Sequence, residues 1–202
     1  MAARELRAGG PSLSGRPVSP EGLAVHLVPM RRRHLRAVMR IEATVYPRPW
    51  SFSLFVSELA LRSVRAYYVA KVEGVVVGYA GLMLTGDEAH VTNIAVAPEW
   101  QRHKVATRLL LTLARTAVER DATGLTLEVR VGNLGAQAMY RRFGMAPVGI
   151  RRNYYAETNE DALLMTASPI DTPAYAIRLA SIEAAVPGST IVETWPARTS
   201  PR

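Results

Sequence analysis

The spacing of hydrophobic and polar residues predicts strands and helices between residues 23 and 170. Runs rich in β-forming residues predict strands: LAVHLVPM, RAYYVAKV, GVVVGYAGLML, EAHVTNIAVAP, GLTLEVRV, APVGIRRNYY and EDALLMTASP. Apolar positions three and four apart predict amphipathic helices at residues 31–45, 51–63, 104–120 and 133–143. Three strands in the middle follow one another without crossover helices, so a doubly wound Rossmann arrangement is not expected. The order predicts an α/β (α+β) fold, a mixed sheet with helices on both faces.

Local signals mark several element ends. Ser51 and Asn133 stand where N-caps are expected, and Gly144 is a suitable C-cap. Glu73-Gly74 indicates a hairpin between two strands. These residues predict where helices begin and end and where one hairpin turns, independently of the rest of the fold.

The two ends of the chain have a different composition. Residues 1–22 are rich in Gly, Pro, Ser and Ala and predict a flexible leader. Residues 171–202 form an extension in which a short helix is plausible around 175–186, stopped by Pro187-Gly188. Beyond that stop we expect irregular chain. The globular domain is therefore expected at 23–170.

Composition excludes some chemistry. The 202 residues include no cysteine, which excludes disulfides, thiolate metal sites and a cysteinyl acyl-enzyme. The four histidines show no metal spacing, so no metal is predicted. No apolar run approaches the roughly 20 residues of a membrane span, and the N-terminus lacks the apolar core of a secretory signal. We therefore expect a cytoplasmic protein that does not bind membranes.

The net charge of +8 leaves the partner open. It is compatible with nucleic acid, an acidic ligand, an RNA-coated particle or a generic solvated basic surface.

The segment QRHKVA, residues 101–106, opens a predicted helix. A helix N-terminus offers unpaired N–H groups and partial positive charge, which favour an anion such as phosphate. Arg102, His103 and Lys104 add cations where the helix dipole disfavours them, so an anionic ligand would explain them. The alternative is a basic first turn in water.

Two stretches carry a resemblance to a known family. NIAVAPEWQRHKVATRLL resembles the acetyl-CoA signature of the GCN5-related N-acetyltransferases; Gln101 and Ala106 match, and Lys104 stands where the family usually has glycine. LEVRVGNLGAQAMYRRFGMAPVGIRRNYY followed by EDALLM is similar to bacterial ribosomal-protein-alanine N-acetyltransferases. The resemblance covers residues 23–170.

The resemblance implies a mixed, mostly antiparallel sheet of about seven strands. The strand at 91–96 would separate from its parallel neighbour at 125–131, and acetyl-CoA would lie in the gap. The residues it places near acetyl-CoA are Ile94, Ala95, Val96, Gln101, Arg102, His103, Lys104, Val105, Ala106, Thr107, Asn133 and Tyr140. Asn133 has the alternative role of an ordinary N-cap.

Lys104 is the departure from the family pattern. If it is already helical, lysine costs little, because the loop acts mainly through backbone N–H groups. If it needs a positive φ, lysine is strained by about 1 kcal/mol. We expect acetyl-CoA binding to be retained in either case.

Acetyl transfer to an amine requires a base, a donor to the carbonyl oxygen and an acid for the thiolate. Glu128, in an apolar strand, is the candidate base, because burial would raise its pKa; alternatively it is a surface residue beside Arg130. Tyr140 is the candidate acid, or else a core aromatic. The resemblance favours the catalytic role for both and implies direct transfer in a ternary complex.

Five residues are candidates for the acceptor cleft. Tyr154 and Tyr155 would face Tyr46 and Trp50 across an apolar slot suited to a small residue such as alanine. Glu42 could bind the peptide's cation. The alternatives are hydrophobic packing for the aromatic residues and a solvated helix face for Glu42.

The resemblance therefore implies an acetyl-CoA-dependent acetyltransferase acting on the α-amino group of a protein N-terminus, with a ribosomal protein as the candidate acceptor. We expect a monomer or weak dimer. One alternative is acetylation of a small amine or a lysine side chain. Another is a non-catalytic basic module that binds nucleic acid or the ribosome, although nucleic acid is not expected as a direct ligand.

Overall fold

The computed structural model describes residues 22–193, so residues 1–21 of the predicted leader and 194–202 of the predicted extension lie outside the described residues. One sheet has the strand order β6-β7-β5-β4-β3-β2-β1-β8. The strands are β1 (Ala24–Pro29), β2 (Arg65–Val72), β3 (Val75–Thr85), β4 (Glu88–Val96), β5 (Gly124–Arg130), β6 (Ala146–Tyr155), β7 (Glu160–Ala167) and β8 (Ser189–Val192). The α-helices are α1 (Leu35–Val45), α2 (Phe52–Ala60), α3 (Val105–Glu119), α4 (Leu134–Arg142) and α5 (Pro173–Ala184).

The sheet is mixed and mostly antiparallel, as predicted. Its central parallel pair, β4 and β5, is in register only from Glu88 with Gly124 to His90 with Thr126. Both strands continue beyond that point, to Val96 and Arg130, without further pairing to each other. The predicted separation of the two strands is therefore confirmed.

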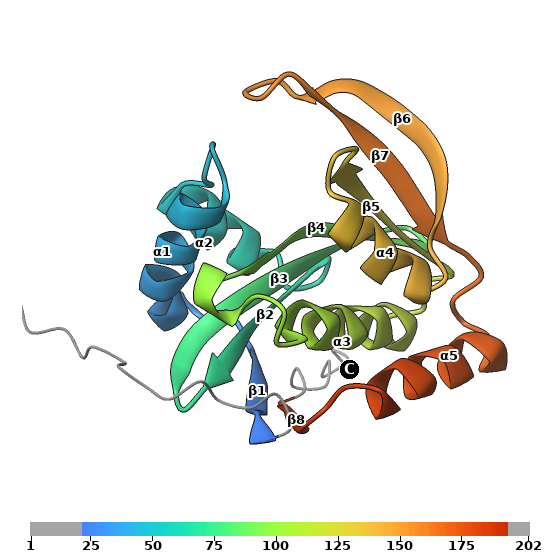
Figure 1. Cartoon of the computed structure of the whole chain (residues 1–202), viewed down its shortest axis with the longest axis horizontal. Helices are drawn as coiled ribbons and strands as arrows, with labels where there is room; N and C mark the ends of the chain where they lie inside the picture. The colour runs from blue at the N-terminus through green and yellow to red at the C-terminus, as the bar shows by residue number, and fades with distance from the viewer. Residues whose placement is uncertain (1–21, 194–202) are drawn as a thin grey trace, which may run out of the picture.

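Helices cover both faces of the sheet (Figure 1). Buried residues of α1 and α2 pack with one set of sheet side chains, and buried residues of α3, α4 and α5 pack with another. Figure 1 also shows the β6–β7 hairpin standing away from the helical layers. β6 is exposed along almost its whole length, which leaves this hairpin free to form one side of a cleft.

Several predicted element ends are confirmed. The Ser51 hydroxyl accepts from the Leu54 N–H (3.2 Å), and Asn133 Oδ1 accepts from the Ala136 N–H (3.1 Å). Gly144 follows α4 with a φ of 79°. The helix expected at residues 31–45 instead begins with a 3-10 turn, η2 (Arg32–His34), before α1.

The prediction of irregular chain after Gly188 is wrong. Residues Ser189–Val192 form β8, a strand parallel to β1, so the sheet has eight strands rather than about seven. Gly188 has a φ of 80°, and a Cβ there would overlap the Leu23 carbonyl oxygen. A four-residue strand carries too little local pattern to be read without its partner.

The C-terminal segment is attached to α3. Arg108 of α3 is 2% exposed and donates to the Pro187 and Ser189 carbonyls and to the Thr190 hydroxyl. Arg115, on the same helix, makes a two-bond ion pair with Glu183 of α5 (2.8 and 2.6 Å). Residues 173–192 therefore brace the helix whose start was predicted to bind phosphate.

Candidate active site

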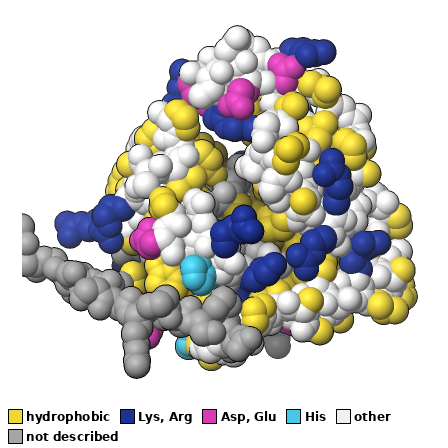
Figure 2. Space-filling view, in the orientation of Figure 1, with side chains coloured by type: hydrophobic (Ala, Val, Ile, Leu, Met, Phe, Trp, Pro, Cys, Tyr) yellow, Lys and Arg dark blue, Asp and Glu magenta, His cyan; other side chains and the backbone are white. Residues whose placement is uncertain are grey.

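A cleft of about 500 Å³ opens where β4 and β5 separate. Figure 2 shows this face hollowed between the α1–α2 side and the β6–β7 side. All of the predicted catalytic and acceptor residues line the cleft, together with two further predicted cofactor residues: Glu42, Tyr46, Trp50, Ile94, Glu128, Asn133, Tyr140, Tyr154 and Tyr155. Segments far apart in the sequence therefore meet in one cleft.

Glu128 lies in this cleft with a side chain only 6% exposed. Its Oε2 is 3.0 Å from His90 Nε2, and its Oε1 is 3.2 Å from Arg151 Nε. The surface alternative beside Arg130 is not observed, because Arg130 pairs instead with Glu157 and Glu160. The Glu128 carboxylate is therefore held in the cleft by two basic side chains that come from other strands.

His90 and Arg151 were not predicted from the sequence as site residues. His90 reaches Glu128 from the neighbouring strand, and Arg151 reaches it from β6, two strands away in the sheet. No sequence spacing signals either contact. Burial lowers the pKa of His90, although the Glu128 charge opposes the shift. At neutral pH, His90 is therefore a neutral imidazole that can take up a proton.

Tyr140 lines the same cleft from α4 and also packs in the core, so the two predicted interpretations are compatible. Its side chain is 8% exposed. Burial raises the pKa of the Tyr140 phenol, which keeps the hydroxyl protonated. A protonated phenol is the form that can donate a proton to a thiolate.

Glu42 is a second buried carboxylate, 1% exposed, on the α1 side of the cleft. Its Oε2 accepts from the Trp50 N–H at 2.7 Å. Burial raises the pKa of Glu42 to about 7, and the Trp50 bond opposes this only in part. Tyr46 donates to the Ile94 carbonyl (2.9 Å), which joins this side of the cleft to β4.

Tyr154 and Tyr155 form the opposite side from β6. The Arg130 guanidinium lies 3.9 Å from the centre of the Tyr155 ring, a cation–π contact. Burial raises the pKa of Tyr155 to about 12. Arg130 therefore holds the Tyr155 ring, and Tyr154 packs edge-on against that ring while remaining half-exposed. Both tyrosines line the cleft opposite the predicted acceptor residues of α1 and the segment after it.

The turn before α3 has an unusual backbone. Arg102 has a φ of 67° and Lys104 a φ of 61°, both left-handed. The first i to i−4 bond of α3 runs from the Arg108 N–H to the Lys104 carbonyl (3.1 Å). The N–H groups of Val105, Ala106 and Thr107 thus precede the helical ladder and are available to an anion.

Lys104 therefore adopts the positive φ, which is the strained one of the two predicted alternatives. The Gln101 side chain donates to the Val96 carbonyl (3.3 Å) and closes the turn onto the end of β4. Figure 2 shows Lys and Arg side chains gathered over the α3 and α4 side of this face. The backbone and the charge both suit a phosphate group.

Not every predicted cofactor residue lines the cleft. The Ala95 side chain packs with the α1–α2 core, and Val96 packs on the α3 side. Residues 101–107 lie around the start of α3, outside the cleft lining. The turn follows β4, so an elongated ligand could extend from the turn to Ile94 in the cleft.

Acetyl-CoA, which would be a substrate, fits the groups present. Its phosphates could bind at the turn before α3. The amides of its extended arm could pair with the edge of β4, which has no β5 partner after His90. Asn93 also lines the cleft, and its Nδ2 is buried without a partner among the described residues. A buried donor of this kind is satisfied when a ligand carbonyl binds.

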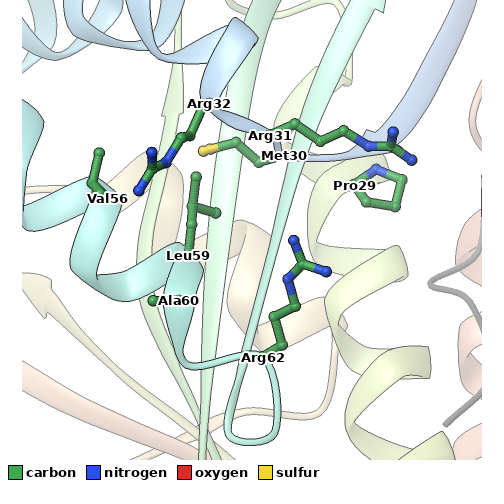
Figure 3. Close-up of a pocket in the computed structure, with 8 residues that line it drawn as sticks. All are labelled: Pro29, Met30, Arg31, Arg32, Val56, Leu59, Ala60 and Arg62. Atoms are coloured by element: carbon green, nitrogen blue, oxygen red, sulfur yellow. The ribbon is translucent and has the colours of Figure 1, made fainter. Parts of the chain in front are cut away.

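A second pocket, of about 600 Å³, lies between the end of β1 and α2 (Figure 3). Arg31, Arg32 and Arg62 surround an apolar floor of Met30, Val56 and Leu59. It contains none of the predicted site residues. Among residues 22–193, no group of three or more His, Cys, Asp or Glu residues could hold a metal ion, and no helix is long and apolar enough to cross a bilayer.

The fold and the cleft agree with a comparison to known families. The model of the acetyltransferase (GNAT) family matches residues 35–145. The chain belongs to this family, and it is an N-acetyltransferase.

Within this family, the chain is similar to N-acetyltransferases of ribosomal proteins. The [ribosomal protein bS18]-alanine N-acetyltransferase of Escherichia coli (strain K12) is 36% identical over 138 residues, covering 67% of this chain and 91% of the relative. A Bacillus subtilis (strain 168) protein with a provisional assignment to the same activity is 40% identical over 136 residues, 67% of this chain and 90% of the relative. The crystal structure of the Escherichia coli ribosomal-protein-S18-alanine N-acetyltransferase matches with a TM-score of 0.66 and 31% identity, over 72% of this chain and 94% of that chain.

Proposed function

We propose that this protein transfers the acetyl group of acetyl-CoA to the α-amino group of a protein N-terminus. One observation carries the proposal: Glu128 is buried in the cleft where β4 and β5 separate, held between His90 and Arg151, with Tyr140 lining the same cleft. The names of the relatives support an N-terminal alanine of a ribosomal protein as the acceptor.

Glu128 is the proposed base. An α-amino group has a pKa of about 7.7–8, so a carboxylate with a neutral imidazole beside it suffices to remove its proton. Glu128 receives the proton from the acceptor's ammonium, and His90 passes it toward solvent. Arg151 holds the carboxylate in position through its contact with Oε1.

The bond changes are those of direct transfer in a ternary complex. The amine nitrogen attacks the thioester carbonyl carbon, the Ile94 N–H donates to the carbonyl oxygen, and the carbon–sulfur bond breaks. Tyr140 donates its proton to the departing thiolate. The ammonium nitrogen loses two protons. One enters solvent, and the other replaces the proton that Tyr140 gave to the CoA thiolate.

The proposed acceptor site lies between the α1 side and the β6 side of the cleft. Glu42 receives the positive N-terminus, because its carboxylate is buried beside the cleft and has a backbone N–H as its only hydrogen-bond partner among the described residues. Tyr46 and Trp50 on one side, and Tyr154 and Tyr155 on the other, would bound the proposed slot with aromatic rings. A small first residue such as alanine suits that slot.

The proposed donor site is the turn before α3. The N–H groups of residues 102–107 bind the pyrophosphate, and the side chains of Arg102, His103 and Lys104 add charge. The pantetheine arm pairs with the free edge of β4 as far as Ile94, and Asn133 and Tyr140 lie beside its end.

Two measurements test the proposal. Calorimetric titration should show acetyl-CoA binding with a Kd in the micromolar range. Short peptides that begin with a free alanine should then be acetylated, whereas the same peptides with a blocked N-terminus and an internal lysine should not. Acetylation of the blocked peptides would instead favour lysine as the acceptor, and absence of acetyl-CoA binding would overturn the assignment of the turn.

A further inference from the structure

A chain of hydrogen-bonded hydroxyl groups crosses the sheet beneath the acceptor side of the cleft. Tyr67 of β2 is 1% exposed, and its hydroxyl lies 2.7 Å from Glu58 Oε2 and 3.3 Å from Thr92 Oγ1. Thr92 belongs to β4 and lines the cleft. The chain therefore runs from α2, through the core, to the cleft.

The sheet has the space for this crossing because of Gly81. Gly81 of β3 is the register partner of Tyr67 on one side and of Asn93 on the other. A Cβ on Gly81 would overlap both the Tyr67 ring and the Thr92 hydroxyl. The absence of a side chain at this position lets the tyrosine reach across β3 to β4.

The donors in this chain have a defined direction. Glu58 is paired with Arg65 (2.6 Å), and an ionised carboxylate only accepts, so Tyr67 donates its hydrogen to Glu58. The Tyr67 oxygen is then an acceptor toward Thr92. The Thr92 hydrogen goes to Tyr67 or to Asn93 Oδ1, each at 3.3 Å.

A hydroxyl has one hydrogen and two lone pairs. Because the Thr92 hydrogen is used inside the protein, Thr92 offers only a lone pair to the cleft. We propose that Thr92 Oγ1 accepts a hydrogen bond from the acceptor's α-amino N–H, and that Tyr67 and Glu58 are positioning residues that hold the hydroxyl in this orientation. The inference rests on the proposed function and adds a group that selects acceptors bearing N–H donors.

Two neighbouring tyrosines of β2 provide a matched pair of variants. Tyr67→Phe removes only the hydroxyl that orients Thr92. Tyr68→Phe is the control: Tyr68 is the next residue on β2, is 3% exposed, and has its hydroxyl 3.2 Å from Thr116 Oγ1 of α3 on the opposite face. Both variants lose a buried tyrosine hydroxyl, so both should lower the Tm, and Tyr67→Phe should lower it more because its hydroxyl also donates to the Glu58 carboxylate.

Only Tyr67→Phe should affect the acceptor. With a free-alanine peptide, its KM should rise by about fivefold, the effect of one hydrogen bond, with the KM for acetyl-CoA unchanged. Tyr68→Phe should leave both KM values unchanged. If Tyr67 had a purely structural role, the two substitutions would change the peptide KM by the same factor, and that result would overturn the inference.

Thr92 itself gives the second measurement. Thr92→Val keeps the shape and removes the hydroxyl, so the peptide KM should rise by about tenfold or more. Thr92→Ser retains the hydroxyl and should restore most of the affinity. If the wild type acetylates the peptide and both Thr92→Val and Tyr67→Phe show wild-type KM values, only the inference is wrong. If the wild type binds acetyl-CoA but acetylates no free N-terminus, the proposed function is wrong, and the inference that rests on it is wrong too.

Discussion

The two buried carboxylates of the cleft, Glu128 and Glu42, have opposite surroundings. Glu128 has a histidine within 3.0 Å and an arginine within 3.2 Å. Glu42 is more deeply buried but has one backbone N–H at 2.7 Å, and burial raises the pKa of its carboxyl to about 7. Burial by itself therefore does not assign a role. The basic side chains that other strands bring to Glu128 distinguish the proposed base from Glu42, which has no such partner among the described residues and is proposed to bind a cationic ligand.

Glu128→Gln should produce the largest effect. The kcat should fall by about 10²- to 10⁴-fold, because the amine loses its proton acceptor. Acetyl-CoA affinity, measured by calorimetry, should stay unchanged and thereby show an intact fold. If kcat falls by less than tenfold, Glu128 is not the base, and the difference between the surroundings of Glu128 and Glu42 does not reflect catalysis.

Glu42→Gln should change how stability depends on pH. Below pH 4.5, the carboxyl is neutral in both states. Between pH 4.5 and about 7, the unfolded chain releases the proton that the folded protein keeps, so the wild type loses on the order of 3 kcal/mol of unfolding free energy as the pH rises, with no further loss above that window.

The glutamine variant lacks this loss and can still accept from the Trp50 N–H. Urea unfolding at several pH values from 4.5 to 7.5 should show that the unfolding free energy of the variant increases relative to that of the wild type as the pH rises. Parallel stability curves for the two proteins would contradict the difference drawn between Glu42 and Glu128.

His90→Gln should sharpen the comparison by removing one partner of Glu128. The kcat should fall by about tenfold, since the carboxylate remains but its proton relay is lost. The peptide KM should change little. As a control, His26→Gln alters an exposed histidine on β1, away from the cleft lining, and should leave the kinetics unchanged. Equal effects of the two substitutions would remove the relay role.

Lys104→Gly should have the smallest effect, on the donor side of the cleft. Glycine relieves the left-handed strain but costs entropy in folding, so unfolding free energy should change by about 1 kcal/mol or less. The backbone N–H is retained, and the Kd for acetyl-CoA should change by less than about threefold. Binding by the glycine variant alone would show that lysine disables the phosphate site in the native protein.

The local features of the fold were readable from sequence. The caps at Ser51 and Asn133 and the glycine after α4 act over three or four residues, so their chemistry is complete within a short segment. The periodicity of the α3 segment and the β-forming runs likewise reflect which face each element buries. The family resemblance supplied what these patterns could not: the separation of β4 from β5.

Other features were settled only by the tertiary structure. The strand β8 exists because it pairs with β1 at the other end of the chain. Glu128 lies among an apolar run in the sequence, and nothing there indicates that His90 and Arg151 would reach it. The left-handed φ of Lys104 was one of two open alternatives. The sequence by itself determined most of the elements, several of their ends and the kinds of reactive group, because those depend on neighbours along the chain. The electrostatic partners of each group depend on strand order and on register between distant segments, and only the folded sheet decides them.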